Sequence, residues 1–392
     1  MKKILVFTTS LNLGGITSFL VNIVNKLAEE YEVTLAYTKD SDSKLSLISK
    51  NVKQISYKRP PRFKIFMHMI KRGWLKHALK IKFRNHKRIA PMKSNQRLAF
   101  TEAQETVLPE ILLENFDIAI SSAEFYCNNV VAMKINAARK IAWIHPDYSS
   151  LNTDVTFDRK TLDKFDKIAV VSKSNIESLC FKIPEYKNKI VYVPNTLDIN
   201  RIYESAKHKP AEYENIADDH IIVTVCRLDN SSKRLDRAVE ICKALKERGD
   251  RFKWFVVGDG PDREFILDKV KKAKVEDCMC ILGKRLNPYP YMAFADLFVL
   301  TSQYEGRPIA IDEALTLTCP VIVTKYASAE EQINKSEGII IENSDVNFVR
   351  DFLEKLDWKL LSGFKDNLKI NNHYALLYSE FAIGIKEALG DK

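Results

Sequence analysis

The chain has 392 residues, of which 46% are hydrophobic and 29% are charged. This composition excludes a disordered or fibrous protein and is enough for two ordinary domains with a large buried core. The net charge of +10 suggests an anionic partner, but residues 43–101 hold 17 Lys and Arg and no Asp or Glu, so subtracting them leaves −7 for the rest of the chain.

The number of cysteines and the length of the apolar runs bear on the cellular compartment of the protein. Seven cysteines, an odd number, lie mostly in apolar runs without a Cys-x-x-Cys pair, which is typical of reduced core thiols in a cytosolic protein and predicts no zinc site. No apolar run is long enough to span a bilayer. The opening MKKILVF could start a signal peptide, but polar residues follow at once, so we interpret it as the first strand.

Short β-branched runs alternate with helical patterns in two series. The first series contains a helix at 16–30 and strands at 2–7, 32–37, 116–121, 140–144, 167–172 and 189–193. The polar stretch 205–219 is the predicted linker. The second series contains a helix that ends near Gly249 and strands at 220–226, 252–258, 278–283, 297–302, 320–324 and 338–341. Such apolar strands, separated by helices, predict two doubly wound α/β domains that bind ligands beyond the carboxyl ends of their strands.

A pair of glycines, Gly14 and Gly15, follows the first strand and opens a helix. Glycine allows the backbone to approach a ligand closely, and the helix N-terminus offers unpaired N–H groups to an anion. A simple tight turn between strand and helix is the alternative interpretation.

The basic segment, at about 53–97, carries an apolar stripe. Its apolar residues recur at helical spacing at Phe63, Phe66, Met67, Ile70, Trp74, Ala78 and Ile81, with Lys and Arg around them. A basic amphipathic helix with Trp and Phe predicts binding to an anionic membrane surface. The alternative is a helix whose stripe faces the core and whose basic face is solvated.

Two cations, Arg227 and Lys233, lie between the strand at 220–226 and the next helix. Arg can bind two oxygens at once and Lys adds a point charge, so the pair suits a diphosphate; a solvated basic loop is the alternative. The sequence GDGP follows the next strand. Its Gly258 and Gly260 could form a phosphate loop, but we favour a mostly structural role in close packing.

Two glutamates, Glu305 and Glu313, flank the start of another helix. Glu305 follows the strand at 297–302, Pro308 suits the first helical turn, and Glu313 lies about two turns further on. Carboxylates accept hydrogen bonds from hydroxyl pairs, and the N–H groups between them favour phosphate. The implied ligand has hydroxyls at both ends and phosphates between them, as a nucleoside diphosphate sugar does.

These motifs together resemble the retaining glycosyltransferases of the GT-B fold, family 4 (glycosyl transferases group 1). The resemblance covers nearly the whole chain and is strongest from Ile221 to Thr324. It implies an α/β protein of the GT-B fold, with two Rossmann-like doubly wound domains facing a central cleft. Residues 1–200 would bind the acceptor and 201–375 the nucleotide sugar, while a C-terminal helix at 376–392 would pack back on the N-terminal domain.

The resemblance also implies roles for the charged residues. Glu305 would hold the hydroxyls of the donor sugar, and Glu313 those of the ribose. Arg227 and Lys233 would bind the diphosphate and stabilise it as it leaves. With His145, which would lie beside the donor sugar in the loop AWIHPDY, Glu305, Arg227 and Lys233 form the implied catalytic set.

Further donor contacts would come mainly from the backbone. The amides of Gly14 and Gly15 would face the phosphates, and the base would lie near Lys284 and Arg285. The sugar would be contacted by the residues after Glu305, namely Gly306, Arg307, Pro308 and Ile309.

Three positions depart from the family pattern. The family usually has glycine where this chain has Cys226 and Arg234, and an aromatic residue is common where Arg307 stands. Arg307 would alter the sugar or acceptor preference, whereas Cys226 and Arg234 weaken the match of the phosphate loop.

The sequence therefore predicts a cytoplasmic glycosyltransferase, peripheral on the inner face of the membrane. It would move a hexose or N-acetylhexosamine with retention, from a nucleotide sugar (UDP-linked) to a glycan, lipid-linked or cell-envelope polymer acceptor. No metal, other cofactor or nucleic-acid partner is expected. Three alternatives remain: a glycoside hydrolase that uses the paired carboxylates, a metal-dependent transferase that uses Asp40 and Asp42, and a non-catalytic module that binds nucleic acid or another anionic polymer.

Overall fold

The computed structural model divides the chain into two compact α/β units. It describes residues 1–9, 11, 14–38, 45–57, 62–71, 73, 75, 114–151, 155–214, 216 and 219–391. Unit 1 comprises Met1–Val170, Ser178–Tyr192 and Ile385–Lys392, and unit 2 comprises Val171–Glu177 and Val193–Gly384.

Unit 1 is built on a seven-stranded parallel sheet with the order β3-β2-β1-β4-β5-β6-β7. The strands are β1 Lys3–Phe7, β2 Glu32–Thr38, β3 Lys53–Tyr57, β4 Phe116–Ser121, β5 Ala137–Ile144, β6 Lys167–Val170 and β7 Ile190–Tyr192. The helices between them are α1 Gly15–Leu27, α2 Arg62–Lys71, α5 Tyr126–Lys134, α6 Val155–Leu162 and α7 Lys173–Lys182. The core strands are apolar on both faces because helices cover both sides of the sheet, as the buried Phe19 and Trp143 rings, 4.9 Å apart, illustrate.

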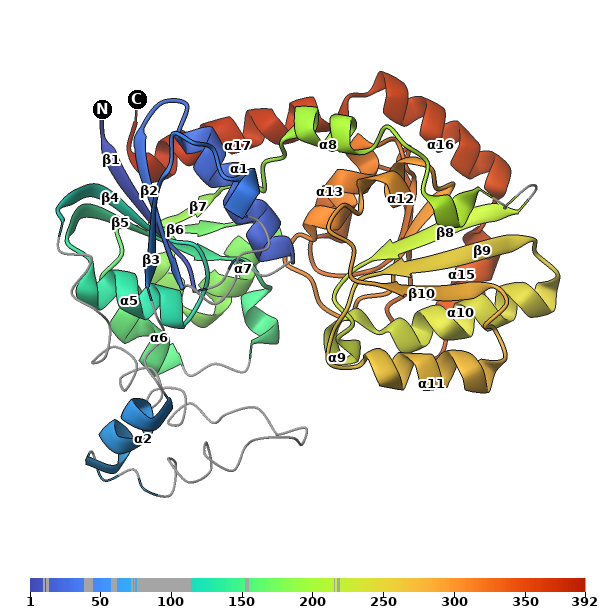
Figure 1. Ribbon diagram of the computed structural model, residues 1–392, viewed down its shortest axis with the longest axis horizontal. Coiled ribbons are helices and arrows are strands. Elements are labelled where there is room, and N and C mark those ends of the chain that lie inside the picture. The colour runs from blue at the N-terminus through green and yellow to red at the C-terminus, as the bar shows by residue number, and fades with distance from the viewer. Residues whose placement is uncertain are drawn as a thin grey trace. The chain divides into compact units, whose positions relative to one another are not determined.

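Unit 2 is built on a six-stranded parallel sheet with the order β10-β9-β8-β11-β12-β13. The strands are β8 His220–Val225, β9 Phe252–Val257, β10 Met279–Gly283, β11 Leu297–Leu300, β12 Val321–Thr324 and β13 Gly338–Ile341. Helices α10 Leu235–Arg248 and α11 Arg263–Ala273 lie on one side of this sheet, and α12 Tyr289–Ala293 and α13 Ile309–Thr316 on the other (Figure 1). The remaining helices are α8 Ile199–Ser205, α9 Asn230–Lys233, α14 Ala329–Gln332, α15 Phe348–Lys355, α16 Trp358–Ile370 and α17 His373–Leu389.

The predicted strands are confirmed in both units, with one omission. Strand β3, Lys53–Tyr57, falls at the start of the predicted basic segment and was not expected as a strand. Only Tyr57 of its five residues is buried, so the strand lacks the apolar pattern that reveals its neighbours. The predicted end of a helix at Gly249 is also confirmed, since Gly249 caps α10 with φ 88°, in the left-handed region that favours glycine.

The last helix, α17, ends in unit 1. Arg139 of β5 donates from Nε to the carbonyl oxygen of Ala388 at 2.8 Å, and the Tyr31 hydroxyl donates to Asp391 at 2.5 Å. None of the described helices is both long and apolar enough to cross a bilayer.

Candidate functional site

Two loops meet at the carboxyl ends of β8 and β11 in unit 2. The two strands are neighbours, with Phe298 paired with Val223, so the loops that follow them are adjacent. Thr301 donates from Oγ1 to the carbonyl oxygens of Lys233 at 3.1 Å and Arg234 at 2.9 Å. These bonds join the loop that carries Arg227 and Lys233 to the loop that carries Glu305, as the motifs required.

Lys233 and Glu305 form an ion pair. Lys233 Nζ donates to Glu305 Oε1, and Ser302 Oγ donates to the same oxygen at 2.6 Å. The side chains of Lys233 and Glu305 are 20% and 11% exposed. Burial lowers the pKa of Lys233, but the attraction of Glu305 outweighs it, so the net pKa is raised and the lysine stays a cation. No sequence pattern marked Ser302 as a partner, although it lies only three positions before Glu305.

Arg227 is exposed on a loop that packs against the GDGP turn and is hydrogen-bonded to it. The backbone N–H groups of Cys226 and Leu228 each donate to the segment Val257–Asp259 at 3.1 Å. A Cβ atom at Gly258 would lie 1.8 Å from the Cys226 carbonyl oxygen, and one at Gly260 would lie 2.3 Å from that of Leu228. The glycines are therefore needed for close packing, which supports the structural role favoured from the sequence.

The two departures beside Arg227 have physical explanations. Arg234 adopts φ 48° and ψ 47°, the left-handed conformation that favours glycine, between helices α9 and α10. Its guanidinium binds Asp236 at 3.0 Å and Asp345 at 2.8 Å, and these contacts offset the strain. Burial raises the pKa of the Cys226 thiol to about 12, so this cysteine is a neutral packing residue.

Glu313 lies in the second turn of α13 with its side chain buried. The Tyr289 hydroxyl of α12 donates to Glu313 Oε1 at 3.2 Å, and Arg201 of α8 donates to the same hydroxyl at 3.2 Å. Arg201 also lies over the Tyr289 ring, 5.6 Å from its centroid. Tyr289 and Arg201 were missed from the sequence because they are 24 and 112 positions from Glu313.

The donor loop, which we define as Glu305–Ile309, is anchored through Arg307. Arg307 is buried and donates from Nε and Nη2 to the two carboxylate oxygens of Asp312, at 3.2 and 3.1 Å. Its backbone carbonyl accepts a hydrogen bond from Asn195 at 3.1 Å, and the Pro308 carbonyl accepts one from Gln332 at 3.0 Å. The guanidinium is directed to Asp312, and the expectation that Arg307 alters the sugar or acceptor preference stays a prediction.

Asp312 has a second partner, His373, which the sequence analysis missed. His373 is the first residue of α17, and its Nε2 lies 3.3 Å from Asp312 while its Nδ1 lies 3.3 Å from Glu337. A lone histidine near the C-terminus carries no pattern that would reveal two carboxylates 61 and 36 positions away.

The positions expected near a base lie after β10. Arg285 donates from Nη2 to Glu212 at 2.8 Å and from Nε to the Tyr291 hydroxyl at 3.1 Å. Its side chain is thereby held beside the linker, while Lys284 is exposed. Gly283 precedes them with φ 74°, so the chain turns sharply at the end of the strand.

In unit 1, the two glycines and His145 lie at different strand ends. Gly14 and Gly15 are exposed at the start of α1, and among the described residues, apart from its chain neighbours, none has an atom within 4 Å of a Cβ placed on Gly14. His145 follows β5, where its backbone N–H donates to Glu124 and its Nε2 lies 2.9 Å from the Ser122 carbonyl oxygen. The Phe19 ring packs edge-on against its imidazole at 4.6 Å.

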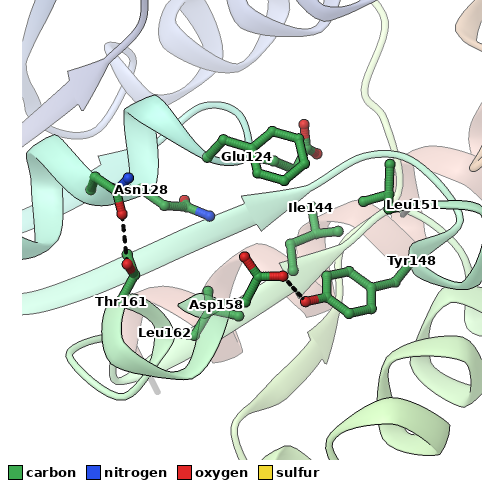
Figure 2. A pocket seen from close by; sticks show the side chains of 10 residues that line it. Glu124, Asn128, Ile144, Tyr148, Leu151, Asp158, Thr161 and Leu162 are labelled. Atoms are coloured by element: carbon green, nitrogen blue, oxygen red, sulfur yellow. Dashed lines mark hydrogen bonds between the residues drawn. The ribbon is translucent and has the colours of Figure 1, made fainter. Parts of the chain in front are cut away.

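A small pocket opens beside Glu124 (Figure 2). It encloses about 20 Å³, enough for one water molecule, and Asn128, Ile144 and Leu151 are among its lining residues. Tyr148 donates to Asp158 at one side of it, and Thr161 donates to the neighbouring Asn129 at 2.6 Å.

The next feature is the arrangement of possible metal ligands in the part of the chain that the structure describes. No group of three His, Cys, Asp or Glu residues is arranged there to hold a metal ion. Asp40 and Asp42, the candidates for a metal-dependent transferase, lie outside the described residues.

Comparison with curated proteins gives matches to glycosyltransferases. The chain is 31% identical over 213 residues to the N-acetylgalactosamine-N,N'-diacetylbacillosaminyl-diphospho-undecaprenol 4-alpha-N-acetylgalactosaminyltransferase of Campylobacter jejuni, which covers 53% of this chain and 55% of the relative. It is 27% identical over 160 residues to the O-antigen biosynthesis glycosyltransferase WclY of Escherichia coli, covering 41% and 43%. The chain thus matches about half the length of the curated relatives, or less.

Solved structures match over nearly the full length. Anabaena Alr3699/HepE in complex with UDP and glucose superposes with a TM-score of 0.68 at 15% identity, covering 97% of this chain and 96% of that one. A variant of S. aureus TarM in complex with fondaparinux, alpha-GlcNAc-glycerol and UDP gives a TM-score of 0.67 at 14% identity, covering 97% and 99%. At this identity the likeness shows the fold alone.

A family match locates the resemblance on the chain. Residues 206–369, which include Arg227, Lys233, Glu305 and Glu313, match the family of glycosyl transferases group 1. The resemblance to the glycosyl transferases group 1 is confirmed over residues 206–369, and the chain has the GT-B fold.

Proposed function

We propose that this protein is a retaining glycosyltransferase that moves a hexose or N-acetylhexosamine from a UDP-linked donor to a lipid-linked or polymeric acceptor of the cell envelope. The observation that carries the proposal is the Lys233–Glu305 pair, which joins the loops after β8 and β11 beside the exposed Arg227. Cations next to a carboxylate at the carboxyl ends of parallel strands suit a diphosphate linked to a sugar.

The donor would bind across these two loops. Arg227 and Lys233 hold the diphosphate, and the N-terminus of α13 adds to the positive potential there. Glu305 accepts hydrogen bonds from the sugar hydroxyls, and Glu313 accepts those of the ribose. Tyr289 holds Glu313 from the side by its hydrogen bond of 3.2 Å.

Transfer breaks the bond between the anomeric carbon and the phosphate oxygen, and the electron pair stays on the phosphate. The two cations stabilise the charge that develops on this leaving group, which is the largest contribution expected in such a site. The acceptor hydroxyl then bonds to the anomeric carbon on the same face, and its proton passes to the departing phosphate. Turnover should therefore survive treatment with a chelator. A complete loss of turnover that added metal restores would instead favour the hypothesis of a metal-dependent transferase that uses Asp40 and Asp42.

We assign the acceptor to unit 1, as the resemblance implies. The contacts predicted for Gly14 and Gly15 with the donor phosphates, and for His145 with the donor sugar, stay predictions. A lipid-linked acceptor is supported by the printed name of the Campylobacter jejuni relative, which contains a sugar linked to diphospho-undecaprenol. UDP in the complexes of Alr3699/HepE and TarM supports the choice of base.

A panel of nucleotide sugars tests the donor. The correct donor should raise the melting temperature, because a ligand that binds only the folded state stabilises it in proportion to its occupancy. Donor hydrolysis without acceptor should follow, and Arg227→Ala should lower its rate at least ~100-fold. A protein that binds nucleotide sugars without any hydrolysis or transfer would instead be a non-catalytic binding module.

Association with membranes is the second part of the proposal. Helix α2 exposes Phe63 and Met67, which are 70% and 37% exposed and lie four positions apart on one helical face. Lys71 at its end is also exposed, whereas residues 58–61, 72, 74 and 76–97 of the segment, which include Trp74, Ala78 and Ile81 of the predicted stripe, lie outside the described residues. We propose that this cationic segment docks the protein on anionic lipid, where each Lys or Arg near the surface contributes about 1 kcal/mol.

Sedimentation with liposomes tests the docking. The protein should bind phosphatidylglycerol vesicles but not neutral ones, and salt should weaken binding, because the Debye length falls to about 3 Å at 1 M. Replacing Lys71, Arg72 and Lys76 with Glu should abolish binding and leave donor hydrolysis intact. The control replaces two exposed lysines of unit 2, Lys243 and Lys272, with Glu in the same way, and this variant should still bind the anionic vesicles. If anionic vesicles do not bind the protein even at low salt, the membrane proposal fails.

A further inference from the structure

A chain of four buried charges runs from the donor loop to the start of α17. Its members are Arg307, Asp312, His373 and Glu337, whose side chains are 4%, 0%, 8% and 2% exposed. Each touches the next at 3.1–3.3 Å. Charges buried to this degree are tolerated only when they are paired, so the four side chains depend on one another.

The geometry requires a charged histidine at the centre of this chain. Both ring nitrogens of His373 face a carboxylate, and a neutral imidazole has only one N–H to donate. In a neutral ring, the nitrogen without a proton would direct its lone pair toward the carboxylate of Asp312 or Glu337, and the two would repel each other. With an imidazolium, two cations and two carboxylates balance and every contact is attractive.

The position of His373 in the fold disfavours its positive charge, so the two carboxylates are needed to stabilise the charged ring. It is the first residue of α17, where the partial positive charge of the helix N-terminus disfavours a cation. The preceding Asn372 has φ 22°, so the backbone turns sharply to bring the ring between the carboxylates. Although burial lowers the pKa of His373, hydrogen bonds to Asp312 and Glu337 raise it to about 9.

We propose that His373 is a positioning residue for the donor site: it holds Asp312 against Arg307 and thereby fixes the backbone of the donor loop. The contact passes through the Arg307 side chain, while the carbonyls of Arg307 and Pro308 are held separately by Asn195 and Gln332. Loss of His373 leaves Asp312 with Arg307 as its cationic partner and leaves Glu337 with the hydrogen bonds from Asn334. The side-chain anchor of the donor loop at Arg307 is then weakened, while the two carbonyl contacts and the contacts of Glu305 with Lys233 and Ser302 remain.

Hydrogen exchange of the full chain tests this inference without any nucleotide. In His373→Gln the amides of Gly306, Arg307 and Ile309 should exchange at least ~10-fold faster, the factor expected when one charge-assisted hydrogen bond is lost. His373→Lys, which restores the positive charge, should recover most of the protection. Phe381→Leu, a core change in the same helix, controls for general loss of stability and should leave these three amides unchanged.

Donor binding provides the second readout, and it rests on the proposed function. His373→Gln should raise the KM for the nucleotide sugar at least ~10-fold with a smaller change in kcat, because His373 touches no reacting atom. Equal exchange at Gly306, Arg307 and Ile309 in the wild type and His373→Gln would overturn the inference. Since the exchange experiment contains no nucleotide, its outcome does not depend on whether the proposed donor is correct.

Discussion

Replacing Lys233 with alanine is the most direct test of the donor site. Lys233 is one of two cations assigned to the diphosphate, and in the structure its ammonium binds Glu305. We expect Lys233→Ala to lower the rate of donor turnover at least ~100-fold, which corresponds to about 2.7 kcal/mol of lost transition-state stabilisation. The loss should appear mainly in kcat, because the charge on the phosphate develops as the sugar departs.

The effect of the same change on stability should be smaller. Removing one partner of a fully buried ion pair costs about 3–5 kcal/mol, but Lys233 and Glu305 are 20% and 11% exposed, and Ser302 still donates to Glu305. We therefore expect a loss of about 1–2 kcal/mol in the free energy of unfolding, less than the kinetic effect. The variant should remain folded at 25 °C, so the loss of turnover can be measured on native protein.

The assay is release of the nucleoside diphosphate, with the melting temperature measured on the same samples. Lys233→Arg keeps the positive charge with a different geometry and should recover part of the turnover. Lys246→Ala removes another paired lysine of unit 2, whose partner Asp277 is on the surface, and should leave turnover unchanged. Folded Lys233→Ala with normal turnover would remove Lys233 from the mechanism.

Three further predictions follow from the same geometry. Glu305→Gln should damage sugar transfer far more than binding of the bare nucleoside diphosphate, whereas Glu313→Gln should weaken that binding itself. Calorimetry with the nucleotide sugar and with the nucleoside diphosphate separates the two effects. If each variant weakened both ligands equally, the proposed division of roles between Glu305 and Glu313 would be contradicted. Gly258→Ala should lower the free energy of unfolding by about 1–3 kcal/mol, because its Cβ would lie 1.8 Å from the Cys226 carbonyl oxygen, and an unchanged denaturant midpoint would refute this. The raised pKa of His373, about 9 against 6.5 in the unfolded chain, contributes up to about 3 kcal/mol that is fully present below pH 6.5 and lost as the pH rises through 9. Urea unfolding between pH 6 and 10 should show this loss in the wild type but not in His373→Gln, and parallel curves would contradict it.

The fold was largely predictable because its strands are buried on both faces. Near-continuous, β-branched apolar runs such as His220–Val225 and Phe252–Val257 are typical of core strands in a covered parallel sheet, so the number and order of strands along the chain follow from local sequence. The exception is β3, Lys53–Tyr57, which is mostly exposed and therefore carries little apolar pattern. Its place in the sheet comes from pairing with β2.

The positions of Arg227, Glu305 and Glu313 were also predictable, because each follows from where a strand ends and a helix begins. Once the sheet is parallel, loops that follow its strands lie at one edge. The glycines at 258 and 260 belong to the same class, since a Gly-rich turn after a strand indicates a close approach of backbones. What the turn approaches, the carbonyls of Cys226 and Leu228, was visible only in the structure.

The sequence by itself determined the strands, the two α/β series and the loops that carry the charged residues, because burial and backbone conformation are set by neighbours along the chain. Tertiary structure alone decided which charges meet. Lys233 and Glu305 are 72 positions apart, and Asp312 and His373 are 61 apart, so their pairing depends on strand order and helix packing rather than on local pattern. Arg307 shows the difference most clearly: its position in the donor loop was evident from the sequence, but the direction of its side chain depended on a buried carboxylate that had to be neutralised.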